Sequence, residues 1–587
     1  EKITIYGDYD VDGITSAYIL SSHLKSKNVD VCVYIPERES EGYGVNFDAV
    51  RKIISDNTTL IITVDNGTAA LDEIKYASEH GIDFVVTDHH ETGRELPDCH
   101  AVVNPRRPDC PYPFKELAGV GVVFKLLCAL EGGACGLFEK YGDMVTLGTI
   151  ADVMSMTGEN RLIVSRGLKL IENTKNLGLS VLIKKACAGK INISSVGFAI
   201  APRINAAGRM TSASQALDLF ESKTIKEAEK HAQNLCDLNK KRQEYGAGVF
   251  SDAVKTVESE WEKISAQRVI VLYDISWKQG VIGIVASRLA EKYGLPAVLM
   301  TVEDNEVKGS ARSIEGYDIY SALKRAVEGL GSCGGHMMAA GVRLFPENIG
   351  KFKKALGEIT RDEISPRVCP PIMIDSEISP EMACLEQIAD LSRLEPYGTG
   401  NPQPLFCLKQ VKILDIVPIG GGKHTRLSLE KDGVVLSAVY FGMGPKRIPY
   451  CTGDMIDAAF NLEINVFRGL SSAQLIIKDL HPASRSLERA RAAMDIYKDL
   501  IESGDCVSDP EPPERMVFAS VWRAVKSISG ETSSSPAILY KILRSCGFVG
   551  GELAMMISLR AFYESGLLAD LTFNEYDFYG EMSLELN

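Results

Sequence analysis

Carboxylate and imidazole side chains gather directly after three short apolar segments within the first ninety residues. Carboxylates that lie close together repel one another unless cations neutralise them. A ligand set of carboxylates and imidazoles without thiolates suits Mn²⁺ or Mg²⁺ better than structural Zn²⁺. Two such ions about 3.5–4 Å apart can activate a water and stabilise the leaving oxygen of a phosphoester. The pattern therefore predicts metal-dependent phosphoester hydrolysis without a covalent intermediate. The side chains are Asp8, Asp10, Asp12, Asp65, Asp88, His89 and His90.

The segment 8–13 also matches the start of a calcium-binding EF-hand loop, and taken alone it fits a solvated Asp-rich turn. The twelfth position of such a loop is Ile19, where the EF-hand requires Glu, and no helix precedes the segment. Two adjacent histidines after a buried strand are hard to explain as core residues in a chain with only nine histidines. The complete set of acids and histidines favours a metal centre over both alternatives.

Parallel strands are the elements expected to position these side chains. Short unbroken apolar runs at 3–6, 60–64 and 84–87 alternate with helical patterns, which is typical of a parallel sheet buried on both faces. Ligands of open α/β sheets bind beyond the carboxyl ends of the strands, which is where the acids and histidines fall. We expect the first helix over about 15–27, with the three alternate acids in extended backbone and Gly13 permitting a tight turn.

The rest of the chain divides by composition into further domains. A charged helical stretch from about 212 to 264 predicts a long connecting helix or helix pair, and a second α/β unit follows it. Short strands with Gly-rich turns from about 370 to 484 predict a β-barrel. The last hundred residues are typical of a helical, winged-helix-like domain. The fold class is therefore α/β, with two α/β lobes joined by a long helix. The predicted boundaries are 1–195, 196–264, 265–366, 367–484 and 485–587.

Composition limits the class of protein. The chain has 587 residues, 45% hydrophobic and 24% charged, which is ordinary for a globular protein and excludes a disordered, collagenous or membrane-spanning chain. The 14 cysteines include no C-x-x-C pair, so we expect free thiols in a reducing cytoplasm. We expect neither a signal peptide nor a membrane segment. A net charge of −14 makes non-specific attraction to a polyanion unfavourable over most of the surface.

Successive motifs along the chain resemble those of the DHH phosphoesterase superfamily. Their order and spacing are similar to the RecJ family of bacterial single-strand-specific exonucleases, over about 1–484. The resemblance implies a DHH domain, a DHH-associated domain and an OB-fold in the first, third and fourth of the predicted domains. The motifs are Gly7-Asp-Tyr-Asp-Val-Asp-Gly13, Val64-Asp-Asn-Gly67, Asp88-His-His90, Gly148-Thr-Ile-Ala-Asp-Val153, Pro202-Arg-Ile-Asn-Ala-Ala-Gly-Arg209, Gly280-Val-Ile-Gly-Ile-Val-Ala-Ser287, Gly309-Ser-Ala-Arg-Ser313, Gly334-Gly-His336 and Leu394-Glu-Pro-Tyr-Gly-Thr-Gly-Asn-Pro402.

The resemblance implies roles for the acids and histidines. Asp8 is expected to lie with the metal ligands, His90 to contact the scissile phosphate, and Asp88 to orient a neighbouring histidine. Asp152 would otherwise pass for an ordinary helix residue. The expected catalytic set is Asp10, Asp12, Asp65, His89, His90 and Asp152, and the metal ligands among them, for two Mn²⁺ or Mg²⁺ ions, are Asp10, Asp12, Asp65, His89 and Asp152.

A basic strip follows Asp152. Between 161 and 210 there are nine basic residues and one acid, a net charge of +8 in an acidic protein. A solvated helix face would explain such a run, but we favour a track for a phosphate backbone, with Arg203 and Arg209 flanking a glycine-containing turn and with Arg106 and Arg107 extending it. The expected DNA or phosphate contacts, partly implied by the resemblance, are Arg106, Arg203, Asn205, Arg209, Ser310, Arg312, Gly334, Gly335 and His336.

The second lobe and the barrel give weaker signals. The small-residue stretch around Gly334 allows close approach of a phosphate, although a tight packing turn is the more common explanation of such a stretch taken alone. Lys278 stands where relatives commonly carry a histidine after the tryptophan, so we assign it no catalytic role. In the barrel, strand aromatics are usually core residues, and we expect one or two at most to stack on bases. The candidates are Phe406, Tyr440, Phe441 and Phe467, with Lys423, His424, Arg426 and Arg468 nearby.

These patterns and the resemblance predict a metal-dependent exonuclease that degrades single-stranded DNA to 5′-mononucleotides in DNA repair and recombination. The 5′→3′ direction is implied by the resemblance alone. One alternative is a DHH phosphodiesterase of short oligonucleotides or cyclic dinucleotides, or a pyrophosphatase. Another is an inactive DHH relative that serves as a binding subunit of a replication assembly. We expect a cytoplasmic monomer without membrane contact, with 485–587 available for a single-strand-binding protein, a helicase or a DNA-binding wing.

Overall fold

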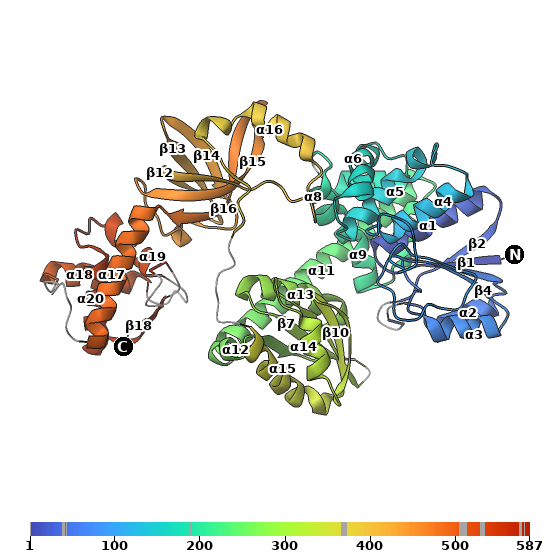
Figure 1. The fold of residues 1–587 in the computed structure, drawn as a ribbon, viewed down its shortest axis with the longest axis horizontal. Helices are drawn as coiled ribbons and strands as arrows, with labels where there is room; N and C mark the ends of the chain where they lie inside the picture. The colour runs from blue at the N-terminus through green and yellow to red at the C-terminus, as the bar shows by residue number, and fades with distance from the viewer. Residues whose placement is uncertain are drawn as a thin grey trace. The chain divides into compact units, whose positions relative to one another are not determined.

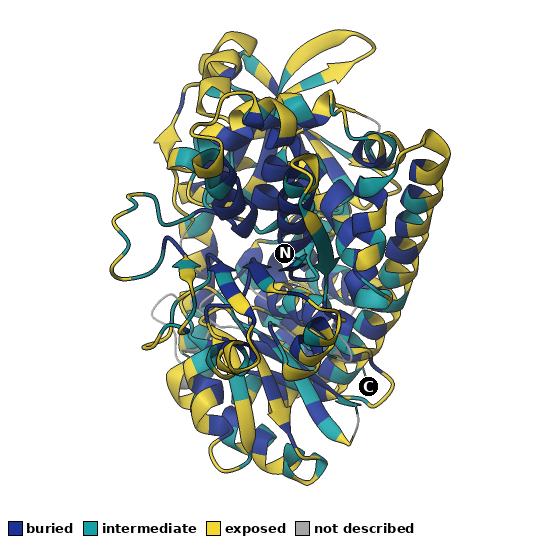
Figure 2. Ribbon diagram, turned by 90° about the vertical axis from the view of Figure 1, so that its right-hand side faces the viewer, coloured by how far each residue is buried: buried dark blue, intermediate teal, exposed yellow. Residues whose placement is uncertain are grey.

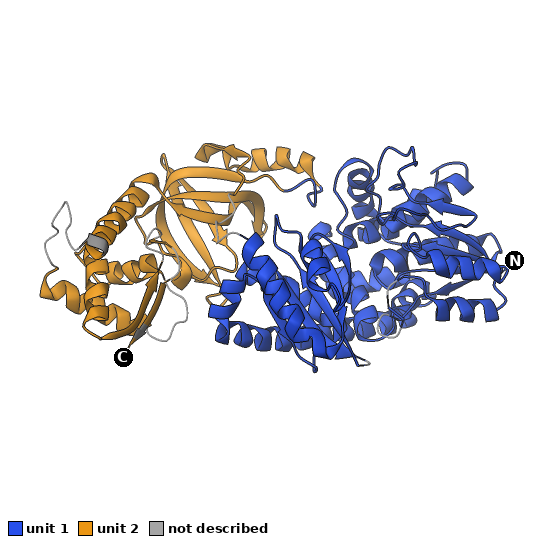
Figure 3. Ribbon diagram, turned by 60° about the horizontal axis from the view of Figure 1, so that its bottom comes forward, with its two compact units in different colours: residues 1–369, 396–402 blue, residues 370–395, 403–587 orange. Residues whose placement is uncertain are grey.

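The chain folds into two compact units in a computed structural model that describes residues 2–37, 41, 42, 44–187, 189–303, 305–364, 372–503, 513–528, 535–573, 578, 579 and 582–586. The first unit comprises Glu1–Cys369 and Pro396–Pro402, and the second comprises Pro370–Glu395 and Gln403–Asn587 (Figure 3). Figure 1 shows the elements of each unit. Each unit has hydrophobic cores of its own, and buried residues concentrate inside the layers of both (Figure 2).

The first lobe is built on a five-stranded parallel sheet in the order β2-β1-β3-β4-β5. Alternate side chains feed two cores, because successive residues of a strand point to opposite faces. Ile5 and Val64 face the core formed with α1, α4 and α5, whereas Ile61 and Val86 face the core formed with α2 and α3. The predicted parallel sheet is confirmed. The strands are β1 (Lys2–Tyr6), β2 (Asp30–Tyr34), β3 (Leu60–Val64), β4 (Asp83–Thr87) and β5 (Ala101–Val103).

Helices cover both faces of this sheet and continue the lobe well beyond it. The larger core extends along the chain as far as Leu238. A π-helix, Val196–Ile200, leads directly into α9. The helices are α1 (Val11–Ser26), α2 (Phe47–Ser55), α3 (Leu71–Glu79), α4 (Gly119–Leu130), α5 (Leu137–Ala151), α6 (Gly158–Glu172), α7 (Leu177–Ala186), α8 (Ile193–Ser195), α9 (Ala201–Met210) and α10 (Ser214–Glu221).

A 35-residue helix, α11 (Ile225–Ser259), confirms the predicted long connection. A capping box between Thr224 and Glu227 begins it, which satisfies two backbone donors that a helix N-terminus otherwise leaves unpaired. Its first half contributes Leu235 to the core of the first lobe, and its second half contributes Val249 to the core of the second. The short helix α12 (Trp261–Gln267) follows.

The second lobe is a five-stranded mixed sheet in the order β6-β7-β8-β10-β9. Only the β6–β7 pair is parallel, and the edge strand β9 consists mostly of exposed small residues. Helix α13 covers one face, and α14 and α15 cover the other. The elements are β6 (Ile270–Tyr273), β7 (Ala297–Glu303), β8 (Glu306–Arg312), β9 (Gly331–His336), β10 (Ala339–Leu344), α13 (Gln279–Tyr293), α14 (Ile319–Ala326) and α15 (Ile349–Glu363).

The second unit begins with a closed five-stranded barrel, as predicted. The strands run in the order β12-β13-β14-β16-β15, and pairing of β15 with β12 closes the ring. The β14–β16 pair is parallel and the others are antiparallel. The Gly-rich turn 420–422 joins β12 to β13 with positive φ at all three glycines. The elements are β11 (Ser376–Glu377), α16 (Leu385–Leu391), β12 (Phe406–Ile419), β13 (His424–Lys431), β14 (Val434–Tyr440), β15 (Met455–Phe467) and β16 (Leu470–Pro482).

Four helices and a hairpin complete this unit. They share one core, to which α17, α18, α19 and α20 all contribute, together with both strands of the hairpin. The predominance of helices agrees with the helical domain predicted from the sequence for this part of the chain. The elements are α17 (Ser484–Ser503), α18 (Arg515–Ile528), α19 (Pro536–Ser545), α20 (Glu552–Glu564), β17 (Leu568–Phe573) and β18 (Met582–Leu586). Among the residues with a described structure, no helix combines the length and the apolar character needed to cross a bilayer.

Candidate active site

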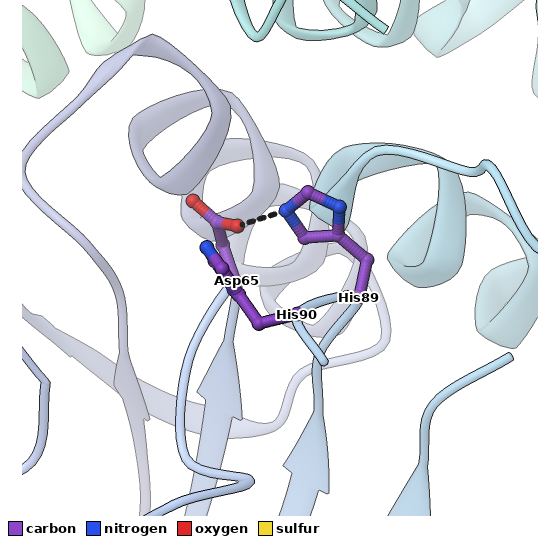
Figure 4. A group of neighbouring side chains, drawn as sticks. All are labelled: Asp65, His89 and His90. Carbon is purple, nitrogen blue, oxygen red and sulfur yellow. Dashed lines mark ion pairs between the residues drawn. The ribbon is translucent and has the colours of Figure 1, made fainter. Parts of the chain in front are cut away.

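The acids and histidines after β1, β3 and β4 meet at the carboxyl edge of the parallel sheet. Each strand is fixed where it ends, because Asp65 N donates to Thr87 O and Asp88 N donates to Val103 O, both at 3.0 Å. Asp65 has a φ of +63°, a left-handed conformation that non-glycine residues rarely adopt. It turns the carboxylate toward the histidines that follow β4 (Figure 4). The centre therefore forms where these strands end, and the left-handed conformation of Asp65 turns its carboxylate into it.

The segment 8–13 folds differently from the extended loop that we expected. Helix α1 begins at Val11, four residues earlier than expected, because Asp10 caps it: Asp10 Oδ1 accepts a hydrogen bond from Gly13 N at 3.0 Å. Asp12 therefore lies in the first helical turn. Gly13 is needed for close approach and not for a turn, since a Cβ there would lie 2.5 Å from Asp8 O. The three acids still meet, through a helix cap and not through strand alternation.

The N-terminus of α4 holds Asp12 in place. Gly119 N donates to Asp12 Oδ2 at 2.6 Å and Val120 N donates to Asp12 Oδ1 at 2.8 Å. Free backbone donors and the helix dipole both favour a carboxylate at this end of a helix. A Cβ on Gly119 would lie 2.7 Å from the Cβ of Asp65, so only glycine lets α4 approach both acids. Sequence analysis missed this element, although the small residues at 118–121 before an apolar helix were its signal.

Three carboxylates surround His89. Its Nε2 lies 3.0 Å from Asp65 Oδ1, 3.6 Å from Asp152 Oδ2 and 3.8 Å from Asp12 Oδ2. Burial is the main cause that lowers the pKa of His89, to about 3, so the imidazole is neutral at physiological pH. Neither His89 Nε2 nor Asp65 Oδ1 makes a hydrogen bond, although both are buried. Two lone pairs that face each other at this distance fit a shared cation, since octahedral Mg²⁺ spaces adjacent ligands about 2.9 Å apart.

The carboxylates of the centre disfavour one another's ionised forms. Burial, followed by the charge of Asp10, raises the pKa of Asp12 to about 7, against the opposing effect of the two α4 donors. Burial and then Asp12 raise the pKa of Asp65 well above its ordinary range, and the same two causes act on Asp152. A cluster of this kind keeps its acids ionised only when cations neutralise them. The donor set and its electrostatics therefore fit divalent metal ions.

Potential ligand atoms form three overlapping sets in which all atoms lie within 4.8 Å of one another. Because the sets share residues but differ in position, they are compatible with more than one ion. Together they contain every acid and histidine of the expected catalytic and metal-binding set. The sets are Asp8, Asp10 and Asp65; Asp12, His89 and Asp152; and Asp65, His89 and His90.

Asp88 holds His90 and the loop that carries it. Its Oδ1 accepts hydrogen bonds from the backbone N of His89 and His90 and lies 2.8 Å from His90 Nδ1, while Oδ2 accepts from Thr68 N. Burial alone would lower the pKa of His90, but the hydrogen bond and charge of Asp88 outweigh it and raise this pKa to about 9. The His90 side chain remains 38% exposed. This arrangement places a protonated imidazole at the edge of the centre, with Nε2 directed away from Asp88.

Asp152 comes from a helix end and not from a strand. It is the C-cap of α5, and Val153 N donates to Ile150 O while Met154 N donates to Thr149 O, the two bonds of a Schellman motif. Glycine usually occupies the position of Val153, whose φ is +56°. A β-branched residue in this conformation costs about 1–2 kcal/mol. No sequence pattern other than the family resemblance pointed to Asp152.

The predicted phosphate contacts of the first lobe are mostly engaged within the protein. Arg106 pairs with Glu91 at 2.7 Å and with Glu116 at 3.1 Å. Arg107, expected to extend the basic strip, pairs with Asp109 and donates to Val102 O.

Residues 201–210 form helix α9, so the glycine-containing turn expected there is wrong. Pro202 lies at the start of α9, where its fixed φ suits a helix. Asn205 Oδ1 accepts from Val11 N, Arg209 donates to Gly280 O and Arg203 donates to Ala199 O. These bonds join α9 to the Asp-rich segment on one side and to α13 on the other.

The predicted contacts of the second lobe lie in register on one sheet. Across β8, β10 and β9, Arg312 aligns with Ala339 and His336, and Ser310 aligns with Gly341 and Gly334. Arg312 donates to Ser310 Oγ at 3.1 Å. Gly335 has a φ of +143°, and a Cβ there would lie 2.5 Å from Ala339 O. The predicted residues are thus neighbours on a strand surface almost free of side chains, and the expected tight turn is an edge strand.

The barrel separates its aromatic candidates by exposure. Phe406 and Tyr440 pack against the barrel core, whereas Phe441 is 57% exposed and Phe467 is 65% exposed. Each exposed ring has a polar or cationic neighbour: His424 packs edge-on against Phe441, and the Arg468 guanidinium lies 5.2 Å from the centre of the Phe467 ring. The two exposed rings are therefore the ones available to bases.

Comparison with known proteins places this geometry in context. Three family models match the chain: the DHH family, N-terminal domain over 2–149, the DHHA1 domain over 266–362 and the RecJ OB domain over 374–479. The single-stranded-DNA-specific exonuclease RecJ of Bacillus subtilis is 39% identical over 82% of this chain, which spans 61% of that protein. The protein of the same name from Haemophilus influenzae is 34% identical, over 82% of this chain and 88% of its own length.

Solved structures give the same likeness. RecJ from Thermus thermophilus in complex with Mn²⁺ matches with a TM-score of 0.72 and 29% identity, over 82% of this chain and 69% of that one. An exonuclease RecJ bound to manganese matches with a TM-score of 0.52 and 34% identity, over 61% of this chain and 90% of that one.

Proposed function

The chain belongs to the RecJ family, and from this membership and the geometry of the centre we propose that it is a metal-dependent exonuclease of single-stranded DNA. Relatives that carry this name are 34% identical over 88% of their length and 39% identical over 61%. The observation that carries the proposal is the buried Asp65–His89 pair, with four further carboxylates around it, at the carboxyl edge of the parallel sheet. The reaction is hydrolysis of the terminal phosphodiester to a 5′-mononucleotide.

Two divalent ions, Mn²⁺ or Mg²⁺, are held by the acids and by His89. Related structures contain Mn²⁺, which supports this assignment for the present chain. When bound, the ions supply an activated water and stabilise the leaving oxygen. The proposed ligands are Asp8, Asp10, Asp12, Asp65, His89 and Asp152.

The chain's own residues orient this chemistry. The neutral His89 offers a lone pair to a cation, because burial keeps a proton off its ring. His90 keeps a proton on its ring through Asp88, so it can donate a hydrogen bond to a non-bridging oxygen of the scissile phosphate. The α4 N-terminus fixes Asp12 with two backbone hydrogen bonds, so this carboxylate does not have to reorganise when substrate binds. These residues bind, orient and hold a proton, and none of them forms a covalent intermediate.

The substrate contacts are proposed on both lobes of the first unit. The basic strip at 161–210 supplies positive charge to a protein of net −14, and Arg106 can exchange one of its two carboxylate partners for a phosphate. On the second lobe, Arg312 and His336 flank the bare strand surface at Gly334 and Gly335, with Ser310 in the adjacent row. The 5′→3′ direction, like the repair and recombination role, rests on family membership. Arg203, Asn205 and Arg209 also belong to the proposed contact set.

The remaining proposals concern the location, oligomeric state, partners and domain boundaries of the protein. The chain acts as a cytoplasmic monomer, and its C-terminal residues 485–587 are the proposed contact for a single-strand-binding protein or a helicase. The proposed domain boundaries are those expected from the sequence, except that Pro396–Pro402 of the fourth domain belongs to the first unit. The RecJ OB domain argues against an enzyme restricted to dinucleotides, because such relatives need only the two α/β lobes. Every expected ligand position is filled, which argues against an inactive binding subunit.

The test is digestion of end-labelled single-stranded and double-stranded DNA by the purified chain with Mn²⁺, Mg²⁺ or EDTA. We expect release of mononucleotides from the 5′ end of the single strand only, and no release in EDTA. The variant His89→Ala should lose hydrolysis by at least about 10³-fold while it retains DNA binding. Asp98→Asn, which changes an exposed acid of the same lobe, is the matched control. Undiminished Mn²⁺-dependent digestion by His89→Ala would refute the proposal.

A further inference from the structure

The loop that carries Asp152 contains a strained residue, Val153, but the side chain of Val153 does not maintain the strained conformation. The Val153 side chain is 69% exposed, so its own packing cannot enforce a φ of +56°. Strained backbone persists only where the surrounding structure fixes it from both sides. On the N-terminal side, the Schellman bonds of α5 provide this restraint. On the C-terminal side, restraint must come from the residues that follow Val153.

A distant segment packs on those residues. Pro396–Pro402, here the return segment, belongs to the first unit, although the chain before and after it belongs to the second. Thr399 O accepts a hydrogen bond from Met156 N at 2.7 Å. Met156 itself is only 2% exposed. The return segment is therefore the partner of the loop immediately after Asp152.

The two glycines of the return segment allow this contact. A Cβ on Gly398 would lie 2.5 Å from Met156 Cγ, and a Cβ on Gly400 would lie 2.7 Å from Ser155 Oγ. Gly400 also has a φ of +74°. The segment closes on itself, since Gly398 and Asn401 exchange backbone hydrogen bonds at 2.9 and 3.0 Å. It thus presents a compact, pre-shaped surface with no side chain at the two closest points.

The return segment leads directly into the barrel. Gln403 O and Pro404 O both accept hydrogen bonds from Asn461, a buried residue of β15. Only three residues separate Gln403 from Thr399. The sequence motif at 394–402 had no role in the expected site, but its residue Thr399 is hydrogen-bonded to the loop that follows Asp152, and the chain continues from the motif into the barrel strand β12.

We propose that the return segment positions Asp152 for metal binding. By accepting a hydrogen bond from Met156 and packing Gly400 against Ser155, it fixes the loop, keeps Val153 in its left-handed conformation and so holds Asp152 Oδ2 3.6 Å from His89 Nε2. Gly398, Thr399 and Gly400 are positioning residues that touch neither metal nor substrate. The inference rests on the proposed function only in that the centre binds Mn²⁺.

The test measures Mn²⁺ affinity, by isothermal titration of the full chain, in three variants. Gly400→Ala introduces the clash with Ser155, and we expect Mn²⁺ binding to weaken at least about tenfold, the loss typical of a misplaced ligand. Gly81→Ala is the matched control, because Gly81 has a φ of +77° in the same lobe and nothing within 4 Å of its would-be Cβ. Its affinity should not change. The double variant Gly400→Ala with Ser155→Ala removes the clashing oxygen, and its affinity should return to within about threefold of the original chain.

Melting temperatures without metal separate positioning from general damage. Both single variants place alanine at positive φ, so this strain is common to Gly400→Ala and Gly81→Ala, and any additional fall in the melting temperature of Gly400→Ala measures the clash with Ser155. Unchanged Mn²⁺ affinity in Gly400→Ala would overturn the inference, and so would an equal loss in the double variant. If Gly400→Ala does not fold, Gly398→Ala, which displaces Met156, is judged by the same titration. If the original chain fails to digest DNA while Gly400→Ala still loses Mn²⁺ affinity, the proposed function falls and the positioning role stands.

Discussion

Replacing Asp65 by Asn should stabilise the metal-free protein and abolish its stabilisation by metal. Asp65 is 2% exposed and faces Asp12, Asp10, Asp8 and Asp152, whose charges, together with burial, raise its pKa. Asparagine keeps the shape of the side chain and tolerates the left-handed φ of +63° at this position. The substitution therefore removes one charge from the cluster at little conformational cost.

The neighbouring acid gives the magnitude. The pKa of Asp12 is raised from 3.8 to about 7, so the folded state binds this proton more tightly than the unfolded state does. Above pH 7 the ionised Asp12 therefore destabilises the metal-free fold by roughly 4 kcal/mol, at 1.36 kcal/mol per pKa unit, and this penalty vanishes as the pH falls to about 4. Asp65→Asn removes one buried carboxylate, and with it both the burial cost and the repulsion by the neighbouring acids, so it should recover about 1–3 kcal/mol at pH 8. In melting temperature this is a rise of about 3–10 °C.

Metal should offset most or all of this difference in stability between the two proteins. Mn²⁺ at about 100 times its dissociation constant should stabilise the original chain by about 2.7 kcal/mol, whereas Asp65→Asn should gain little. Thermal unfolding of both proteins at pH 8, in EDTA and in Mn²⁺, measures the effect, with Asp98→Asn as a control for the change of net charge. Two results would refute the reasoning: a lower melting temperature for Asp65→Asn in EDTA, or an unchanged response of this variant to Mn²⁺.

Three further substitutions test single elements of the site. Gly119→Ala should weaken Mn²⁺ binding at least about tenfold in titrations, because its Cβ would lie 2.7 Å from Asp65 Cβ; Gly121→Ala, whose nearest neighbour would be at 3.4 Å, should not. His90→Ala should lower kcat on single-stranded DNA by about 10²–10³-fold with a smaller change in Mn²⁺ affinity, and equal losses in both would show that His90 acts mainly as a ligand. Val153→Gly should raise the melting temperature, since glycine adopts a φ of +56° without the strain of about 1–2 kcal/mol, and a lower melting temperature would contradict the account of this helix end.

The strand ends were predictable because parallel strands impose a simple rule. A buried strand reads as an unbroken apolar run, and every run ends at the same edge of the sheet, so Asp65 and His89 could be placed together from their positions alone. The two adjacent histidines indicated that this edge of the sheet holds a metal centre. Such predictions succeed because the position of a strand and its direction can both be read from a short stretch of sequence.

Residues contributed by helix ends were not predictable in this way. Asp12 was placed in extended backbone because Asp-x-Asp resembles a loop, whereas the capping bond from Gly13 to Asp10 begins a helix there. Residues 201–210 contain Pro202 and Gly208 and suggest a turn, but proline is compatible with a helix start, and glycine is compatible with a helix at position 208, where a Cβ would lie 2.9 Å from Tyr9 O. Asp152 depends on how α5 packs, a tertiary property that only the family resemblance anticipated.

The net charge of −14 has little bearing on nucleic-acid binding, because the acids and the bases of this chain occupy different environments. Asp8, Asp12 and Asp65 are each at most 3% exposed, so their charges face one another and not the solvent. Cations bound among them would cancel this charge at the point where a phosphodiester must enter. The strip at 161–210, in contrast, carries its net positive charge on α6, α7 and α9, of which α9 is hydrogen-bonded to the Asp-rich segment through Asn205. A polyanion that approaches this region therefore meets basic side chains next to acids whose charge is neutralised. If the strip contacts DNA as proposed, we expect metal binding to strengthen DNA binding through these carboxylates, although no carboxylate needs to contact a nucleobase.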